Sequence, residues 1–345
     1  MNSLPRVKVF STSGSVELAD KVCLALRARL PEALQPEGGL AVCNAGFEMF
    51  DNGCILPHVE NVRDHLVVIF CTHSSGIHDQ LFELFHLIDA VENADAAEIL
   101  LVFPYLDYVR SDKKDQPHIS VMSRFLAEII NSHPIIRKKI ILDPHNDHVL
   151  QYFRPTANGI SAVLLLVDYL EREFLVPGGR TESVVVFCDQ GAATRYREVA
   201  RFLNLPTAYV DKQRVSGRTT PLGIVGNVEG KRCILLDDEV VTGGTATSDA
   251  DMLLARGALS VVFSAIHPIL SKKGVPASDL MARLEGSSIG TFIVTDSVPL
   301  ADKLAGVKKF RVVSVVNLLA EAIKRIIMGE SLTQLYLRDR VSLYR

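Results

Sequence analysis

The sequence predicts an α/β protein with two tandem doubly wound domains, each built on a mainly parallel sheet. The prediction comes from the length of 345 residues, the alternation of short apolar runs with helix-like segments, and one strand–loop–helix pattern that occurs in both halves. A chain of this length exceeds what one hydrophobic core usually serves, so two domains are expected. Runs that are apolar on both faces are typical of parallel strands covered by helices on both sides.

Short apolar runs rich in Val, Ile and Phe are predicted to be buried strands. In chain order they are 67–71 (VVIFC), 99–103 (ILLVF), 140–142, 184–188 (VVVFC), 233–236 (CILL), 261–266 and 292–295. A helix is predicted over 78–93, because apolar residues recur there at the spacing of one helical face. Those residues are Leu81, Leu84, Phe85, Ile88 and Val91. The alternation implies right-handed crossovers between parallel strands.

The strand–loop–helix pattern occurs once in each half. The run that ends at Cys71 continues into the small polar loop 72–76 (THSSG) and then into the predicted helix. The run that ends at Leu236 continues into an acidic pair, the loop 242–245 (TGGT) and another helical segment.

Between the two copies, Pro155 and Gly159 break the periodicity. The expected domains are 1–155, 156–325 and a C-terminal tail over 326–345.

Composition excludes several classes of protein. The formal net charge is -3 without a long basic run, which argues against nucleic acid as a partner, because binding to the phosphate backbone needs clustered Lys and Arg. No run of about 18 apolar residues occurs, so no membrane span is expected. The N-terminus lacks the features of a secretory signal, and the six cysteines form no CxxC pair. We therefore expect a cytoplasmic protein with reduced cysteines.

The segment 233–249 (CILLDDEVVTGGTATSD) is the most informative part of the chain. Its strand carries Asp237 and Asp238 to the carboxyl edge of the sheet, where ligands bind in open α/β folds. Gly243 and Gly244 let the backbone approach a phosphate, and the free N–H groups of a helix N-terminus favour an anion. Hydroxyl donors come from Thr242 and Thr245. The alternative is a polar strand-to-helix turn with a Thr cap.

This segment resembles the loop that binds phosphoribosyl pyrophosphate (PRPP) in type I phosphoribosyltransferases and in their relatives, the ribose-phosphate pyrophosphokinases (PRPP synthetases). The resemblance to the synthetases extends along nearly the whole chain, and an ordinary phosphoribosyltransferase has only one such domain. The matching segments are 10–22 (FSTSGSVELADKV), 81–90 (LFELFHLIDA), 102–114 (VFPYLDYVRSDKK), 141–153 (ILDPHNDHVLQYF), 294–300 (VTDSVPL) and 311–326 (RVVSVVNLLAEAIKRI). The chain thus looks like a divergent synthetase, which implies two tandem domains of the type I phosphoribosyltransferase kind.

The resemblance implies an enzyme that transfers the diphosphoryl group of Mg-ATP to the C1 hydroxyl of ribose 5-phosphate, giving PRPP and AMP. By this resemblance, 242–245 bind the 5-phosphate, and Asp237 and Asp238 orient the ribose hydroxyls. Mg²⁺ is the implied cofactor, with His145 and Asp189 as the implied metal-binding residues. His145 closely follows a predicted strand, although a lone His is often structural.

The implied catalytic residues are His145, Lys212 and Arg214, the last two in the segment VDKQR. Diphosphoryl transfer accumulates negative charge on the transferred and leaving oxygens, so two cations on a closing loop would stabilise it. Both could equally be ordinary loop cations. The following residues, 215–222, have a composition that suits a mobile lid.

The implied ATP-binding residues are Phe50, Asn52, Arg110, Ser111 and His145. The fixed charge and planar fork of Arg110 suit a phosphate or a stacked adenine, and the alternative is an ordinary surface Arg. Phe47 gives an alternative register for the adenine-contacting loop.

The chain departs from the family pattern at three places. Val241 stands where members of the family usually have Asp, and Cys54 stands where their adenine loop has Glu. Ser111 replaces a common Gln, and the stretch after it, 111–120, is short. Because that loop helps to form the allosteric phosphate and ADP site in the commonest class of synthetases, such regulation is not expected here.

Two other functions stay open from the sequence. One is a non-catalytic subunit that assembles with active synthetases, and the other is a diphosphokinase for another pentose phosphate. Lys212 and Arg214 favour the enzyme. The resemblance also implies a homo-oligomer built from dimers, with a hexamer as the expected form.

Overall fold

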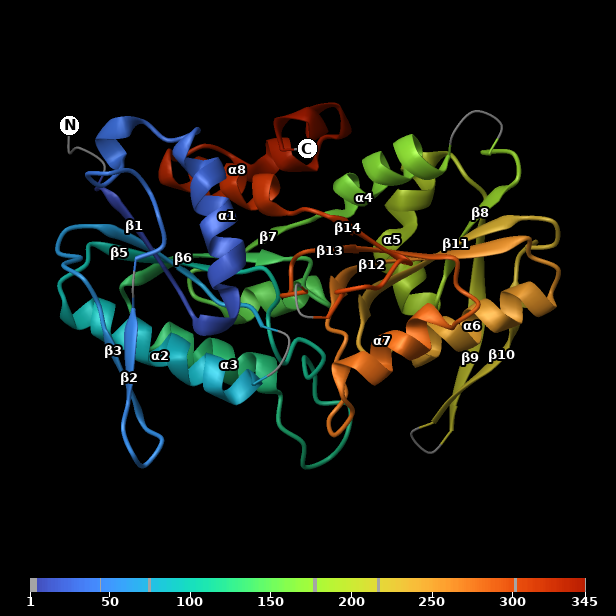
Figure 1. Cartoon of the computed structure of the whole chain (residues 1–345), viewed down its shortest axis with the longest axis horizontal. Coiled ribbons are helices and arrows are strands. Elements are labelled where there is room, and N and C mark those ends of the chain that lie inside the picture. Colours follow the sequence, from blue (N-terminus) through green and yellow to red (C-terminus); the bar gives the residue numbers. More distant parts are fainter. Residues whose placement is uncertain are drawn as a thin grey trace. The chain divides into compact units, whose positions relative to one another are not determined.

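The computed structural model in Figure 1 describes all residues except 1–4, Asn44, Ser74, Ser75, 176–178, Ser216, Gly217, Ala301, Asp302 and Arg345. For Gln190, 213–215, 218–221, Arg340 and Leu343 it describes the backbone only. The chain forms two compact units. The first comprises Met1–Ser161, Ser297–Pro299 and Val315–Arg345, and the second comprises Ala162–Asp296 and Leu300–Ser314.

A five-stranded parallel sheet with the order β1-β4-β5-β6-β7 forms the centre of the first unit. Its strands are β1 (Val7–Ser11), β4 (Leu66–Phe70), β5 (Glu98–Phe103), β6 (Ile136–Leu142) and β7 (Asn158–Ile160). The residues of β4 are all buried, and those of β5 are buried except at its first position. This agrees with a parallel sheet covered on both faces.

Helices cover both faces of this sheet, with α1 and α8 on one face and α2 and α3 on the other (Figure 1). Their bounds are α1 (Val16–Arg27), α2 (Ile77–Asn93), α3 (Met122–Asn131) and α8 (Val316–Ile327). The predicted helix over 78–93 is confirmed as α2, whose predicted apolar face packs into the core. Helix α8, from the far end of the sequence, packs against α1. Just after α1, Arg29 donates a hydrogen bond of 3.0 Å to the side chain of Asn317 on α8.

A separate antiparallel hairpin, β2 (Gly46–Met49) and β3 (Ile55–His58), extends away from the parallel sheet (Figure 1). Short 3₁₀ turns complete the unit at Ser13–Ser15, Glu32–Leu34, Asp147–Tyr152, Leu332–Tyr336 and Arg338–Leu343.

The second unit is built on a seven-stranded sheet with the order β10-β9-β8-β11-β12-β13-β14. Its strands are β8 (Ser183–Phe187), β9 (Thr207–Val215), β10 (Arg218–Val225), β11 (Arg232–Val240), β12 (Ser260–Pro268), β13 (Thr291–Thr295) and β14 (Phe310–Val313). All neighbouring pairs are parallel except β9 and β10. The predicted α/β class with doubly wound parallel sheets is confirmed.

Helices α6 (Gly244–Ala255) and α7 (Ala277–Glu285) cover one face of this sheet, and α4 (Val163–Tyr169) and α5 (Gln190–Leu203) cover the other (Figure 1). A single π-helical turn, Leu170–Phe174, extends α4. In the described part of the chain, no helix is long and apolar enough to cross a membrane.

The segment 215–222, whose composition suits a mobile lid, consists mainly of strand in its described residues. Strand β9 runs to Val215 and β10 starts at Arg218, so the segment belongs to an antiparallel hairpin in which Arg218 pairs with Val215. Its β-branched Val and Thr residues favour extended backbone despite the Gly and Pro residues of the segment.

Candidate active site

The loop that joins β11 to α6 has the backbone of an anion site. Gly243 adopts a left-handed φ of 68°, and a Cβ built there would lie 2.4 Å from a Leu284 side-chain carbon, so only glycine fits. Helix α6 begins at the next residue, Gly244, and its first-turn N–H groups have no carbonyl partner within the helix. Thr245 is exposed at this helix end. The predicted phosphate loop therefore lies at a helix N-terminus, where an anion is favoured.

Two side chains hold this loop in place. The Thr242 hydroxyl accepts a hydrogen bond of 3.4 Å from the N–H of Gly244. Arg283, on α7, donates a hydrogen bond of 2.6 Å to the Thr242 carbonyl. Sequence analysis missed Arg283, because a helical Arg that is separated from the loop by 41 residues carries no local signal.

Asp237 and Asp238 lie near the carboxyl end of β11, where an Asp237 carboxylate oxygen accepts a hydrogen bond of 3.0 Å from the Asp238 N–H. The predicted strand 233–236 is thus longer than expected and contains both acids. Burial raises the pKa of the Asp237 carboxyl well above its ordinary value, and the adjacent Asp238 carboxylate raises this pKa further. Asp238 is buried, and the guanidinium of Arg195 on α5 lies 3.5 Å from one of its oxygens. Arg195 is a second residue that sequence analysis missed.

Asp189 lies two residues after the end of the parallel strand β8 and is the N-cap of α5. One of its carboxylate oxygens accepts a hydrogen bond of 2.7 Å from the N–H of Ala192. A carboxylate at a helix N-terminus is stabilised in its charged form by the helix dipole. This contact fixes the side chain at the same edge of the sheet as Asp237.

Lys212 lies on β9, beyond the part of this strand that pairs with β8. The last residue of β9 in that pairing is Tyr209. Its ammonium donates a hydrogen bond of 2.7 Å to Asp249 on α6, and the side chains are only 9% and 1% exposed. The side chain of Arg214, the other predicted catalytic cation, lies outside the described part of the chain.

In the first unit, His145 follows β6 and is half-buried. The preceding turn begins at Asp143, a non-glycine residue with a left-handed φ of 39°. The hydroxyl of Ser161 donates a hydrogen bond of 2.6 Å to the Asp143 carboxylate, and Asn146 caps the short helical turn that follows. These contacts fix the backbone on both sides of His145.

Arg110 is exposed in the segment that follows β5. Strand β5 is the neighbour of β6 in the sheet. The neighbouring Ser111 has a structural contact: its hydroxyl donates to the Ser120 carbonyl at 3.0 Å and accepts from the Met122 N–H at 3.2 Å. The hydroxyl of Ser111 therefore closes the short loop 111–120 at the start of α3.

Phe50 and Asn52 form the tip of the β2–β3 hairpin. The Phe50 N–H donates to the Cys54 carbonyl at 2.9 Å, and the Asn52 side chain accepts from the Cys54 N–H at 3.0 Å. The Phe50 ring is 45% exposed, so its apolar face is available to a ligand or a partner. Phe47, the alternative adenine-contacting residue, packs instead against the core of the first unit.

The structure thus brings together one group of predicted residues in each unit. In the second unit, Asp189, Asp237, Lys212 and the loop 242–245 share the carboxyl edge of β8, β9 and β11. In the first unit, Arg110 and His145 follow two neighbouring strands, whereas Phe50 and Asn52 lie on the separate hairpin.

Among the described residues, no group of three or more His, Cys, Asp or Glu side chains could hold a metal ion by itself. His145 and Asp189 belong to different units. Mg²⁺ in phosphoryl-transfer enzymes is commonly held by one or two protein side chains together with substrate phosphates and water. The carboxylate of Asp189 fits that mode of binding.

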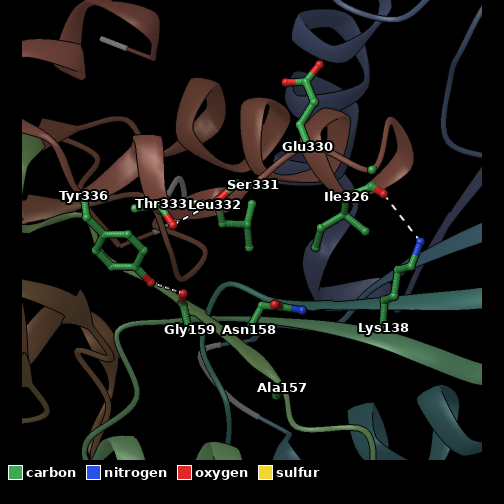
Figure 2. Close-up of a pocket in the computed structure, with 11 residues that line it drawn as sticks. Lys138, Ala157, Asn158, Gly159, Ile326, Glu330, Ser331, Leu332, Thr333 and Tyr336 are labelled. Atoms are coloured by element: carbon green, nitrogen blue, oxygen red, sulfur yellow. Dashed lines mark hydrogen bonds between the residues drawn. The ribbon is translucent and has the colours of Figure 1, made fainter.

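Figure 2 shows a cavity of about 640 Å³ in the first unit, between the β6–β7 edge of the sheet and the segment after α8. Lys138 donates a hydrogen bond of 3.4 Å to the Ile326 carbonyl at one end, and the Tyr336 hydroxyl donates to the Gly159 carbonyl at the other. None of the predicted site residues lines this cavity.

Two family models match successive parts of the chain. Residues 7–133 match the family model described as the N-terminal domain of ribose phosphate pyrophosphokinase, and residues 186–337 match the phosphoribosyl synthetase-associated domain. Ribose-phosphate pyrophosphokinase 1 of Streptococcus pyogenes is 33% identical over 334 residues, which cover 96% of this chain and 97% of that protein. The chain belongs to the ribose-phosphate pyrophosphokinase family. The resemblance inferred from the sequence is therefore confirmed.

Other members of the family agree in sequence and in fold. Ribose-phosphate pyrophosphokinase 2 of Enterococcus faecalis is 32% identical over 335 residues and covers 96% of each chain. The crystal structure of phosphoribosylpyrophosphate synthetase from Mycobacterium smegmatis superposes with a TM-score of 0.80 at 27% identity, covering 94% of this chain and 99% of that one. The two tandem domains of the type I phosphoribosyltransferase kind are thus those of the family.

Proposed function

We propose that this protein is a ribose-phosphate diphosphokinase, which transfers the diphosphoryl group of Mg-ATP to the C1 hydroxyl of ribose 5-phosphate. The observation that carries the proposal is the loop of the second unit, where the N-terminus of α6 lies at the same sheet edge as Asp237 and Lys212. Membership of the ribose-phosphate pyrophosphokinase family supports it.

The loop 242–245 binds the 5-phosphate through the N–H groups of the first turn of α6 and the hydroxyls of Thr242 and Thr245. The left-handed Gly243 supports this role, because its backbone conformation forms the turn that leads directly into the N-terminus of α6. Asp237 and Asp238 accept hydrogen bonds from the ribose hydroxyls, as carboxylates at the carboxyl end of a parallel strand can.

The first unit supplies the ATP-binding residues. Arg110 contacts the nucleotide phosphates or the adenine, and His145 contacts the phosphates and takes part in catalysis. Phe50 and Asn52 contact adenine from the hairpin tip. Ser111 contributes through the loop that its hydroxyl closes by hydrogen bonds to Ser120 and Met122.

Mg²⁺ would be held by His145, Asp189 and substrate phosphate oxygens. When bound, it neutralises charge on the phosphates. The carboxylate of Asp189 is suited to this role, because its hydrogen bond with Ala192 fixes its orientation.

The C1 hydroxyl oxygen attacks the β-phosphorus of ATP. The bond from that phosphorus to the oxygen bridging it to the α-phosphorus breaks, AMP leaves, and the hydroxyl proton passes to solvent. Negative charge grows on the leaving and transferred oxygens, where Lys212 and Arg214 act as cations. Because no covalent intermediate forms on the enzyme, catalysis depends on positioning and electrostatics.

The test is an assay of AMP release with purified protein, ATP, ribose 5-phosphate and Mg²⁺. We expect AMP and PRPP in equal amounts, and loss of activity when Mg²⁺ is removed with EDTA and regained on its return. If ATP binds but no AMP is released, the result would instead support a non-catalytic subunit. Val241 favours that alternative, because it lacks the carboxylate that is usual at this position in the family. A preference for another pentose phosphate in the same assay would reassign the substrate.

The proposal includes a homo-oligomer built from dimers, with a hexamer as its expected form, in which Phe50 contacts adenine bound to a neighbouring subunit. The exposed hairpin tip supports it, because Met49 and Phe50 are 72% and 45% exposed. Light scattering tests it, and a fully active monomer would contradict it. We also propose a reducing, cytoplasmic location, because all six cysteines are free thiols.

A further inference from the structure

Asp249 occupies an unusual position for a carboxylate. Its neighbours on the buried face of α6 are Ala246, Ala250 and Leu253, at the i−3, i+1 and i+4 positions. A carboxylate buried among apolar residues is destabilising unless it is paired. Asp249 is 1% exposed, and Lys212 supplies the pairing.

The strand around Lys212 is shaped to reach Asp249. Strand β9 pairs with β8 only over Thr207–Tyr209, so Lys212 stands on a two-stranded ribbon with β10. The register shifts between Pro221 and Gly223, and Pro221 is the residue paired with Lys212. Such bulges redirect the side chains beside them. The ion pair therefore joins the ribbon to the helix that begins with the phosphate loop.

Stability alone does not account for this pair. Buried ion pairs can often be replaced by apolar residues without loss of stability, because desolvation offsets the attraction between the charges. The pair also neutralises the ammonium, whereas stabilising a developing phosphate charge requires an uncompensated cation. An enzyme that uses Lys212 in transfer must therefore exchange Asp249 for substrate during turnover.

We propose that Asp249 is a positioning residue that holds Lys212 against α6 in the substrate-free enzyme and competes with the transferred diphosphoryl group for its ammonium. This inference depends on the proposed function of Lys212 as a catalytic cation. The β9–β10 ribbon therefore has two arrangements. In one, Lys212 binds Asp249 on α6, and in the other Lys212 contacts substrate.

Two measurements test it with the full-length protein and the variant Asp249→Asn, which keeps the side-chain size and removes the charge. Labelling of amines in substrate-free protein with acetic anhydride, followed by peptide mass spectrometry, should modify Lys212 at least about fivefold faster in the variant. Lys8, which pairs with Glu60 in the other unit, should react equally in both proteins. The value of kcat/KM for MgATP should rise about tenfold, because the ammonium no longer has to leave a buried partner.

The double variant Lys212→Ala/Asp249→Asn completes the cycle. Its kcat should equal that of Lys212→Ala alone, since without Lys212 there is no ammonium to release. Unchanged labelling of Lys212 in Asp249→Asn, or a fall in kcat comparable to that of Lys212→Ala, would overturn the inference. Faster labelling in a protein that releases no AMP would support the hold of Asp249 on Lys212 and reject both the proposed function and the competition with substrate.

Discussion

The guanidinium of Arg195 lies 3.5 Å from a carboxylate oxygen of Asp238, on the α5 side of β11. Asp238 is buried at the point where β11 carries two consecutive carboxylates to the ribose side of the proposed site. Arg195 is thus the nearby positive charge for this acidic pair. No hydrogen-bond partner among the described residues reaches its buried Nε atom.

We expect Arg195→Ala to raise the KM for ribose 5-phosphate about tenfold and to lower the Tm. Removing Arg195 leaves the Asp238 carboxylate buried without its counter-charge. Because the pair is partly exposed, the expected loss in the free energy of unfolding is about 1–3 kcal/mol. Arg197→Ala is the matched control, because Arg197 is exposed on the same helix. Equal KM values for the two variants would show that Arg195 does not support substrate binding.

Lys212→Ala should reduce kcat about a hundredfold or more and change the KM for ribose 5-phosphate little. A contact that forms with developing charge acts on turnover, and one such donor accounts for about 10²–10³ in kcat in other enzymes. Arg214→Ala should behave alike. Steady-state kinetics measures the effect, with the exposed Lys272→Ala as a control. Near-normal turnover in both active-site variants would remove them from the catalytic group.

Val241→Asp should lower the KM for ribose 5-phosphate by roughly ten- to a hundredfold. Val241 is half-exposed at the start of the phosphate loop, and its side chain cannot accept a hydrogen bond from a ribose hydroxyl. One charged hydrogen bond contributes about 1.5–3 kcal/mol, which sets the size of the effect. Val241→Asn separates polarity from charge and should give a smaller change. A wild-type KM in Val241→Asp would mean that substrate does not reach this position.

Enzyme activity should need no added inorganic phosphate, and ADP should inhibit only in competition with ATP. The loop 111–120 is short and is closed by hydrogen bonds from Ser111, which leaves fewer groups to form a separate anion site. Initial rates at several ATP and ADP concentrations give the inhibition pattern. ADP inhibition that excess ATP cannot relieve would show that an allosteric site is present.

Local sequence patterns predicted much of the fold. Helix α2 was predictable because its apolar residues follow the helical period, and seven strands were predictable as short apolar runs, namely β4, β5, β6, β8, β11, β12 and β13. The strand, loop and helix start around 242–245 were predictable because an apolar strand, two acids and TGGT occur in one short segment. The β9–β10 hairpin was missed, because Gly and Pro content does not distinguish a loop from a strand pair that contains a bulge.

Contacts between distant segments were not predictable from local patterns. Asp249 is separated from Lys212 by 37 residues, and Arg283 lies farther still along the chain from Thr242. One signal was available: an Asp within the apolar face of α6 requires a partner, although the sequence does not show which cation provides it.

The return of α8 to α1 has a consequence for synthesis of the chain. The second unit lies within a single stretch of sequence apart from the short return at Ser297–Pro299, whereas the first unit needs residues from both ends. The contact of Arg29 with Asn317 can form only after almost the whole polypeptide has left the ribosome. We therefore expect the α1 side of the first unit's sheet to stay partly uncovered during synthesis. The second unit should reach its native state first, which reverses the usual N-to-C order of co-translational folding.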